Sequence, residues 1–537
     1  MAAGVLLLLA GIMLATVADY GITGDEAVRH RYGRKLLSWY ATLGADRRAV
    51  ADVDISRDGG LFEIVAGVVE RASPLDVYLT RHVVVVFFGL IAFAAAYSLG
   101  NALGGPAAGF FSLAFLALTP PFYGHAFNNP KDVPFAAMFA LAAAAVLRAG
   151  RDWDRPNWMR IAGAGLAVGL VAGERVAGLA FLGYAPALWL TILWIEKDAP
   201  SASTASPARR LRRLGAAWVL TCLLAWTAMV AVWPWAQTQP LTHPLQAMRM
   251  FSRFWDCMVV FFDGQYSCSG LVSRFYLPTW FSLTLPELYL IAFVLALLVV
   301  ARLLEARPRP GPLRIRLAQA VWLAGIVGLP VCWVVVMRTP LYDGLRHSLF
   351  VVPPLAVLAG VSVASYLRHA GRGQRIVASV ALGVACGPTL VDMIQLHPYQ
   401  AVYFNRLVAG GLERAITRYE GDYWCLSYKE GAEWLLLRYS GAQCRDRIRV
   451  AGQSTLQQTQ YYFQKTAEGR RVFRAVDVTT GDPHFVLTTT RFGDHLRTPG
   501  KLVHLVKRQH AAILYLFQVE APSCDPPNVE AGPPSPP

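Results

Sequence analysis

Charged residues are scarce in this sequence, and its long apolar stretches contain almost none. Asp, Glu, Lys and Arg make up 16% of the 537 residues, whereas hydrophobic residues make up 55%. A soluble core of this size could not hide so much apolar surface. Because several apolar runs approach the roughly 20 residues that cross a bilayer as a helix, the sequence predicts a polytopic α-helical membrane protein.

The start of the sequence lacks the basic residues that open a secretory signal peptide. Residues 4–18 are apolar, and no clear small-x-small cleavage site is followed by a mature domain. We therefore expect an uncleaved first span. Ten further runs bring the expected number of transmembrane helices to about eleven: 82–100, 102–119, 134–149, 161–173, 176–195, 214–233, 287–303, 319–337, 348–366 and 376–393.

Lys and Arg are shared unevenly between the connections. They gather in loops 148–160, 197–213, 302–316 and 368–375, which lie on one side if eleven spans alternate, and the positive-inside rule makes that side cytoplasmic. The net charge of +15 is thus an orientation signal, and nucleic acid is not an expected partner. The expected exterior segments are 19–80, 120–133, 234–286, 338–347 and the chain from 394 onward.

The character of the sequence changes after residue 393. Residues 1–393 form the predicted transmembrane domain, and 394–524 a small exterior α/β or α+β domain that either recognises an acceptor or caps a cavity. Alternating patterns predict a helix near 426–439 and strands at 447–450, 461–463, 471–474, 484–490 and 511–517. The Pro-rich residues 525–537 are an expected disordered tail.

A polar stretch directly after the first span carries two adjacent carboxylates, Asp25 and Glu26. Thr23 and Gly24 precede them as a plausible helix cap. We regard this acidic pair as the centre of the candidate site, to which the remaining exterior segments bring a membrane-bound substrate.

Two further exterior loops combine acids, cations and imidazoles. One holds His125, Asn129, Lys131 and Asp132, and the other holds Tyr342, Asp343, Arg346 and His347. Arginine matches phosphate oxygens bidentately, so Lys131, Arg175 and Arg346 make a candidate phosphate site. The alternative for any one of them is that it anchors a helix end at the membrane interface.

Glu174 and Arg175 interrupt the apolar run 161–195. Ionisable groups at such depth are tolerated where they face a water-filled cavity or a partner. Two interpretations stay open: short crossings that meet a recessed exterior cavity, or an internal Glu–Arg pair at a hairpin tip.

In this order and topology, the motifs resemble those of C-type, polyprenyl-phosphate-dependent glycosyltransferases, in the branch of protein O-mannosyltransferases and the lipid A aminoarabinose transferase. The resemblance covers about residues 1–400. It rests on Asp25-Glu26 after the first span, on Asn128 to Asp132 after the third, and on Tyr342 to His347 before a late span; His397 to Asn405 and Glu420 to Glu430 resemble stretches of bacterial members.

The resemblance implies a membrane glycosyltransferase that moves a sugar from a polyprenyl-phosphate donor to an acceptor hydroxyl on a protein, lipid or glycan of the cell envelope. Asp25 would be the base, with Glu26 orienting or supplying a second carboxylate. Lys131, Arg175, Arg346 and His347 would bind the leaving phosphate, supported by His125, Asn129, Asp132, Tyr342 and Asp343. A single displacement inverts the anomeric configuration. The resemblance implies no definite cofactor, and Asp25 and Asp132 could hold a divalent metal.

Cysteine placement suggests disulfides on the exterior side. Cys257 and Cys268 lie eleven residues apart in the aromatic-rich loop 234–286, which lines a lipid or acceptor path or seats itself in the headgroups. Among Cys425, Cys444 and Cys524, the pair nearest in sequence, Cys425 and Cys444, is the expected bond.

A secondary transporter of a lipid-linked or small anionic solute is the rival interpretation, with a non-catalytic scaffold behind it. Transporters place ionisable groups within their spans and show internal repeats. Here the polar groups cluster in exterior loops, and the sequence shows no internal repeat. We therefore favour the enzyme, a multi-pass protein of a bacterial inner membrane with its site and C-terminal domain on the periplasmic side.

Overall fold

The computed structural model describes residues 2–52, 55–150, 153–196, 206–252, 257–305, 311–453 and 456–526. Within this part, nine helical segments are long and apolar enough to cross a membrane, or ten with the bent pair α6 and α7, and the shorter α9 lies at the remaining predicted position. The structure thus confirms the polytopic helical fold, with a helix at each of the eleven predicted spans.

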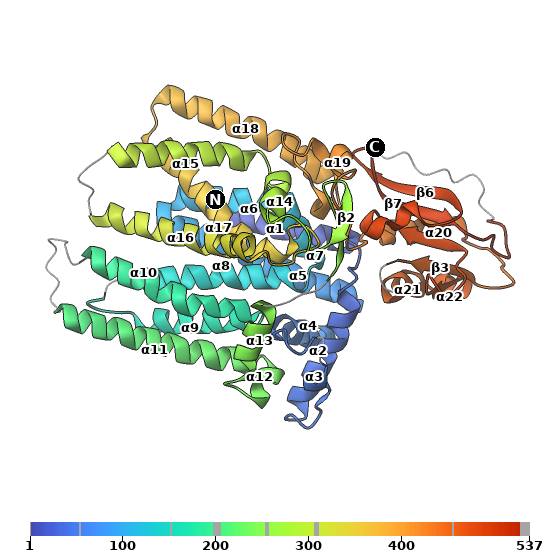
Figure 1. Cartoon of the computed structure of the whole chain (residues 1–537), viewed down its shortest axis with the longest axis horizontal. Helices are drawn as coiled ribbons and strands as arrows, with labels where there is room; N and C mark the ends of the chain where they lie inside the picture. The colour runs from blue at the N-terminus through green and yellow to red at the C-terminus, as the bar shows by residue number, and fades with distance from the viewer. Residues whose placement is uncertain are drawn as a thin grey trace.

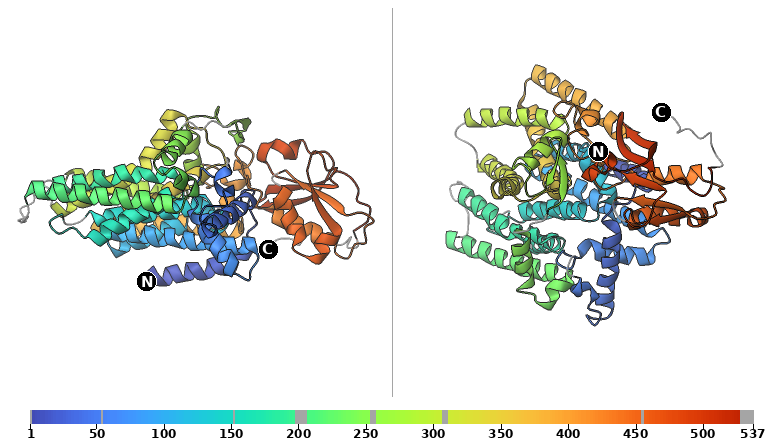
Figure 2. Two further views of the ribbon diagram at one scale, coloured as in Figure 1. Left: turned by 90° about the horizontal axis from the view of Figure 1, so that it is seen from below. Right: turned by 45° about the vertical axis from the view of Figure 1, so that its right-hand side comes forward.

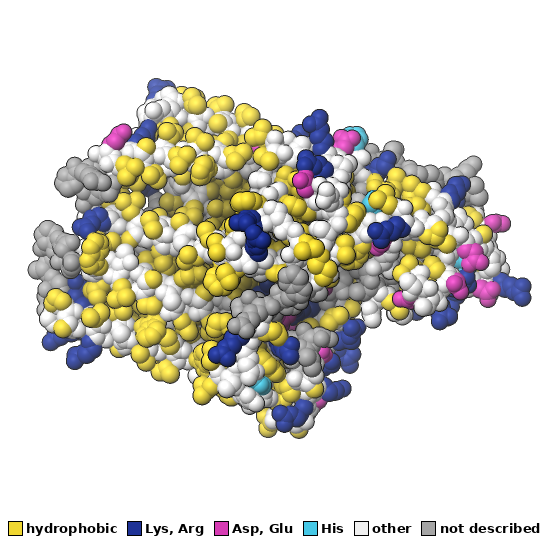
Figure 3. All heavy atoms as spheres, in the orientation of Figure 1, with side chains coloured by type: hydrophobic (Ala, Val, Ile, Leu, Met, Phe, Trp, Pro, Cys, Tyr) yellow, Lys and Arg dark blue, Asp and Glu magenta, His cyan; other side chains and the backbone are white. Residues whose placement is uncertain are grey.

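These segments are α1 (Ala2–Thr16), α5 (Val77–Gly104), α6 (Pro106–Ala117) with α7 (Pro120–Asn128), α8 (Asp132–Ala149), α9 (Trp158–Ala172), η2 (Val176–Ala180) with α10 (Phe181–Glu196), α11 (Pro207–Ala231), α15 (Leu288–Glu305), α16 (Gly311–Met337), η3 (Arg346–Val351) with α17 (Val352–His369), and α18 (Arg372–Gln395). They run side by side as one bundle (Figure 1). Apolar side chains cover much of its outer face (Figure 3).

The basic connections and the polar segments lie at opposite ends of this bundle. The C-terminal ends of α10 and α15, the N-terminal ends of α11 and α16 and the α17–α18 turn are at the left of Figure 1, whereas the helices of segment 19–80 and the C-terminal strands lie toward the right. Figure 2 shows the same separation from below. We call these the basic end and the site end. Of the basic residues predicted to mark the first, Arg151, Lys197, Arg307 and Arg309 lie outside the described residues.

Short elements build the site end. They are η1 (Val17–Asp19), α2 (Glu26–Ala41), α3 (Arg48–Ala51), α4 (Leu61–Ala72), α12 (Pro234–Thr238), α13 (His243–Ser252), β1 (Val259–Phe262), β2 (Gln265–Cys268), α14 (Tyr276–Thr284), η4 (Gln400–Val402) and α19 (Gly411–Ala415). The helices of segment 19–80 are those that the mixture of apolar and charged residues there predicts.

The predicted loop 120–133 is helical over most of its length. α6 and α7 meet at 70°, because Pro120 cannot continue a helix and holds Thr119 in an extended conformation (φ −102°, ψ 95°). All nine residues of α7 are buried. His125 and Asn128 are therefore held inside the protein by helix packing.

The C-terminal domain is a mixed sheet with helices, as predicted. Its strand order is β4-β3-β5-β7-β6, with β3 parallel to both β4 and β5, and β7 antiparallel to both β5 and β6. The elements are α20 (Tyr428–Arg438), β3 (Ile448–Gly452), α21 (Leu456–Gln464), α22 (Ala467–Val472), β4 (Phe473–Val476), β5 (Phe485–Thr488), η5 (Arg491–Leu496), β6 (Lys501–Arg508) and β7 (Ala511–Gln518). One hydrophobic cluster joins this domain to the bundle.

Two details of that domain differ from the prediction. Residues 461–463 belong to α21 and not to a strand, because the buried positions Gln458, Thr459, Tyr462 and Phe463 follow a helical period. β6 was not predicted, since only one of its eight residues is fully buried and its pattern does not alternate. The predicted disordered tail lies outside the described residues, except for residues 525 and 526.

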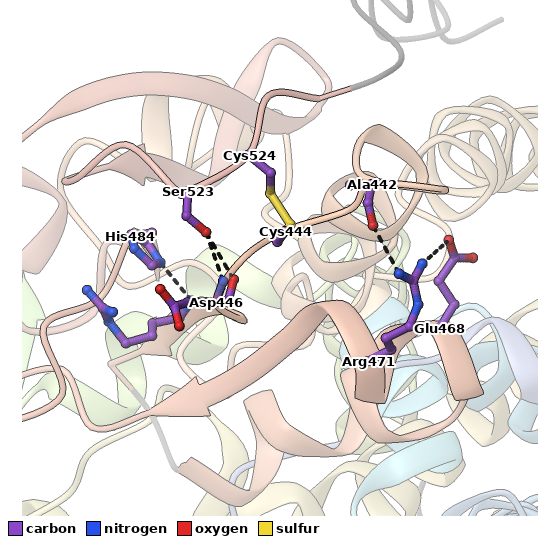
Figure 4. Close-up of a disulfide and its surroundings, with 9 residues drawn as sticks. Ala442, Cys444, Asp446, Glu468, Arg471, His484, Ser523 and Cys524 are labelled. Atoms are coloured by element: carbon purple, nitrogen blue, oxygen red, sulfur yellow. Dashed lines mark hydrogen bonds and ion pairs between the residues drawn. A yellow bond between two sulfur atoms is a disulfide. The ribbon is translucent and has the colours of Figure 1, made fainter.

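The structure contains two disulfides in its described part. Cys257–Cys268 closes the β1–β2 hairpin, which confirms that pair. The predicted bond between Cys425 and Cys444 is wrong: Cys444 is bonded to Cys524, and Cys425 is a buried free thiol. The 11 residues of α20 span about 16 Å between Cys425 and Cys444, whereas Ser523, next to Cys524, accepts a hydrogen bond from the Asp446 amide (Figure 4).

We expect Cys444→Ser to leave one new alkylatable thiol, at Cys524, and to lower the free energy of unfolding by about 2–4 kcal/mol, because the lost bond closes a long loop. Alkylation with mass spectrometry and thermal unfolding measure both effects. Cys425→Ser is the matched control and should expose no additional thiol; labelling of Cys444 in that variant would contradict the pairing.

Candidate active site

A cavity of about 400 Å³ lies at the site end, where the bundle meets the C-terminal domain. Stretches that are far apart in the chain form its wall: the start of α2, residues 55–58, Lys131, Met258 before β1, residues 342–346 up to the start of η3, and the C-terminal domain. The lining residues are Gly24, Asp25, Val28, Arg29, Ile55, Asp58, Lys131, Met258, Tyr342, Asp343, Arg346, Trp424, Cys425, Tyr428, Gln453, Thr489, Arg491, Phe492 and Asp494.

Asp25 presents its carboxylate to this cavity from the residue before α2. Its side chain forms no cap to the helix, is 43% exposed and lies 3.1 Å from a terminal guanidinium nitrogen of Arg346. The carboxylate is therefore both solvent-accessible and beside a fixed cation.

Glu26 points elsewhere, because adjacent residues at the start of a helix project about 100° apart. Its carboxylate is buried, accepts a hydrogen bond from the Thr23 amide at 2.7 Å and lies 3.0 Å from His82. Glu26 does not line the cavity. It fixes the first turn of α2 and thereby the direction of Asp25.

Arg346 lies among three carboxylates at the centre of the site. Its guanidinium lies 3.1 Å from Asp25, 3.2 Å from Asp343 and 3.6 Å from Asp132, and the side chain is 6% exposed. The guanidinium carbon of Arg346 lies over the Trp424 ring, 4.6 Å from the ring centre. A cation held between carboxylates and a ring on a rigid turn has little freedom to move.

Asp343 connects Arg346 to the C-terminal domain. It adopts a left-handed backbone (φ +58°), followed by Gly344 at φ +64°, and lies 3.2 Å from Arg346 and 2.8 Å from Arg491. Burial raises the pKa of the Asp343 carboxyl, although both arginines oppose the shift. Arg491 thus brings a cation from the C-terminal domain to the cavity wall.

Lys131 and Arg29 share one carboxylate, that of Asp58. The Lys131 ammonium lies 3.1 Å from it, and Arg29 donates a hydrogen bond to it. Burial would raise the pKa of Asp58, but Lys131, Arg29 and Arg175 together hold it well below its usual range. Burial lowers the pKa of the Lys131 ammonium, which Asp58 partly offsets. This wall of the cavity carries more cations than anions.

The other predicted residues form a second layer behind the cavity. Asn129 accepts hydrogen bonds from the amides of Lys131 and Asp132 and donates to the Asp132 carboxylate at 3.0 Å. Arg175 pairs with that carboxylate, His347 lies 3.3 Å from Arg346, and His125 hydrogen-bonds the Tyr423 hydroxyl at 2.9 Å. Tyr342 is the exception and lines the cavity itself.

Glu174 and Arg175 do not pair with each other. Glu174 is buried and accepts a hydrogen bond from the Phe62 amide at 2.9 Å, whereas Arg175 binds Asp132. The chain at Gly59 lies so close to Gly173 that an added Cβ would be 1.9 Å from its carbonyl oxygen. Glu174 therefore joins the end of α9 to the start of α4, Arg175 joins it to the start of α8, and neither lines the cavity.

Glu174 should make the protein less stable as pH rises. Burial raises the pKa of its carboxyl to about 8, so between the ordinary pKa of about 4.3 and 8 the folded protein binds a proton that the unfolded chain has released. The free energy of unfolding then falls by up to about 1.4 kcal/mol per pH unit. Melting temperatures at pH 6–9 should fall less steeply for Glu174→Gln; an unchanged slope would contradict this, and Glu413→Gln, an exposed carboxyl, is the control.

A metal does not fit between Asp25 and Asp132 as the structure places them, because the Arg346 guanidinium already lies between the two carboxylates. Among the described residues, no group of three or more His, Cys, Asp or Glu side chains could hold a metal ion.

Several lining residues were not predicted as site residues. Arg29 and Asp58 belong to polar stretches noticed in the sequence, and Trp424 to a stretch that carries the resemblance. Arg491, Thr489 and Asp494 carry no local signal, since only the folding of the C-terminal domain onto the bundle brings them to the cavity.

No protein-family model and no curated protein matches the chain. It is similar to the solved structure of ArnT from Cupriavidus metallidurans in the apo state, with 16% identity, 96% of this chain and 98% of that chain covered, and a TM-score of 0.48. ArnT bound to undecaprenyl phosphate matches with 15% identity, 99% and 98% covered, and 0.48. The oligosaccharyltransferase AglB from Archaeoglobus fulgidus, in complex with an inhibitory peptide and a dolichol-phosphate, matches with 10% identity, 91% and 69% covered, and 0.46. Both are C-type glycosyltransferases, and ArnT is the lipid A aminoarabinose transferase.

Proposed function

We propose that this protein is an integral-membrane glycosyltransferase that moves a sugar from a polyprenyl phosphate to an acceptor hydroxyl. One observation carries the proposal. The exposed carboxylate of Asp25 faces a cavity whose wall also holds Lys131 and Arg346. A base for the acceptor and cations for the leaving phosphate are the two requirements of this displacement.

The Asp25–Arg346 contact suggests how the two parts cooperate. A donor phosphate that binds Arg346 and Lys131 competes with the Asp25 carboxylate for the guanidinium. Once released, Asp25 is free to accept the proton of the acceptor hydroxyl, whose oxygen forms a bond to the anomeric carbon while the bond from that carbon to the phosphate oxygen breaks. The phosphate then leaves as an anion beside its cations. Glu26 lies outside the cavity, and Asp58 and Asp343 are already paired with cations. We therefore assign the base to Asp25 alone, and a single displacement then inverts the anomeric configuration.

The acceptor would enter from the side of the C-terminal domain. Arg491, Thr489 and Asp494 form that wall of the cavity, and their polar groups suit a hydroxyl-bearing protein, lipid or glycan. The site lies at the end opposite the basic loops, so we place it on the periplasmic face of a bacterial inner membrane.

Transfer from a panel of radiolabelled polyprenyl-phosphate sugars tests the proposal. Membranes that contain the protein should pass label into one of the protein, lipid and glycan fractions, which names the acceptor class, whereas membranes without it should not. The absence of label in every fraction with every donor would contradict the proposal. The anomeric configuration of the product, determined by NMR, tests inversion separately.

A further inference from the structure

A second, larger cavity of about 880 Å³ lies away from the active site, between α15, α16 and α17. It begins beside Tyr289, near the start of α15, and reaches Arg302 at the basic end. Thirteen residues of helix separate these two positions, which is a distance of about 20 Å. One leaflet contributes about 15 Å of hydrocarbon to the bilayer. Because the groove is long enough to hold an acyl chain of one leaflet, we call it the acyl groove.

The wall of the acyl groove is apolar over most of its length. Phe293, Leu317, Val321 and Leu355 are among its lining residues, and none of the described residues that line it is Asp or Glu. The surface that α15 and α16 present in Figure 3 is correspondingly covered by hydrophobic side chains. Such a wall fits a hydrocarbon chain.

Cations gather at only one end of this groove, where Arg302, Arg316, Arg368 and His369 line it. Neutral groups hold two of the arginines in place: Arg302 donates to the Gln374 amide oxygen at 3.1 Å and lies over the Tyr366 ring at 5.0 Å, and Arg368 donates to the Gly104 carbonyl. Within the described part of the chain, none of the three arginines forms an ion pair with a carboxylate. The orientation of the protein in the membrane accounts for basic residues at this end of the bundle. It does not explain why their side chains line one end of an apolar groove.

We propose that the acyl groove binds an anionic phospholipid from the leaflet at the basic end, with an acyl chain along α15 and the phosphate among Arg302, Arg316 and Arg368. Arginine donors match phosphate oxygens, and three uncompensated cations repel one another until an anion joins them. The polyprenyl phosphate of the active site is a different ligand, since its phosphate belongs at the opposite end of the bundle.

Native mass spectrometry of the purified full chain tests this assignment. With phosphatidylglycerol and phosphatidylcholine of equal chain length, the wild type should retain the anionic lipid preferentially. Arg302→Gln/Arg316→Gln/Arg368→Gln should lower retention of phosphatidylglycerol about 100-fold and leave that of phosphatidylcholine unchanged, and Arg316→Gln alone should lower it about fivefold. Arg316 makes no recorded hydrogen bond or ion pair with a described residue, so this variant separates lipid binding from folding.

The matched control is Arg209→Gln/Arg212→Gln, which removes two exposed cations of α11 at the same end of the bundle but outside the acyl groove. It should retain phosphatidylglycerol like the wild type. Equal retention of both lipids by the wild type, equal loss in the control, or displacement of phosphatidylglycerol by undecaprenyl phosphate would overturn the proposal.

Discussion

Asp25→Asn should fold and insert normally but transfer sugar about 10²–10⁴-fold more slowly than the wild type, the range expected for loss of a general base. The amide keeps the shape of the carboxylate and can still accept a hydrogen bond from Arg346, but it cannot take a proton from the acceptor. Initial rates with a saturating polyprenyl-phosphate donor measure the effect, and thermal unfolding tests the fold.

Asp19→Asn is the matched control for Asp25→Asn. Asp19 lies in the same stretch and contacts His397 at 2.9 Å, but it does not line the cavity. The same chemical change should therefore leave the rate within about twofold. Equal rates for Asp25→Asn and the wild type would show that Asp25 is not the base, and the proposed mechanism would then lack its proton acceptor.

Arg346→Lys should lower the transfer rate about 100-fold, as does removal of one preorganised donor to a developing anion. Lysine keeps the charge, but its single ammonium cannot contact Asp25, Asp132 and Asp343 together or present two parallel donors to phosphate. The buried Asp132 and Asp343 keep Arg175 and Arg491 as partners, so the protein should still fold.

The affinity for undecaprenyl phosphate distinguishes the effect of Arg346→Lys from that of Asp25→Asn. Arg346→Lys should bind undecaprenyl phosphate more weakly, whereas Asp25→Asn should bind it at least as well as the wild type, because the competing carboxylate charge is gone. Arg406→Lys, which changes the ion pair of the exposed Arg406 with the buried Asp392 away from the cavity, is the control. Normal affinity in Arg346→Lys would show that other cations hold the phosphate.

The predictions that succeeded depend on short-range patterns. The bilayer imposes length and polarity on each span, so hydropathy located all eleven helices. Asp25, Lys131, Tyr342, Asp343 and Arg346 line one cavity, because each is a polar residue next to a helix end at the site end of the bundle.

The predictions that failed depend on contacts between distant segments. Arg491 meets Asp343, and Cys444 meets Cys524, only after the C-terminal sheet has formed and packed against the bundle. Cys425 was predicted to pair with Cys444 because the two are near in sequence. Glu26 was predicted to share the site with Asp25 because the two are adjacent, but a helix turns neighbouring side chains in different directions.

Residues of the C-terminal domain form hydrogen bonds with the stretch before Asp25. The Ile22 amide donates to the Tyr462 hydroxyl at 2.8 Å, and Gln458 donates to the Ile22 carbonyl at 2.6 Å, across 440 and 436 residues of sequence. At about 5–20 residues per second, a ribosome needs roughly 20–90 seconds to pass from one partner to the other. The Asp25 carboxylate is thus synthesised early, whereas the stretch before it gains these contacts only when the chain is nearly finished, so we expect the nascent chain to be inactive until translation is almost complete.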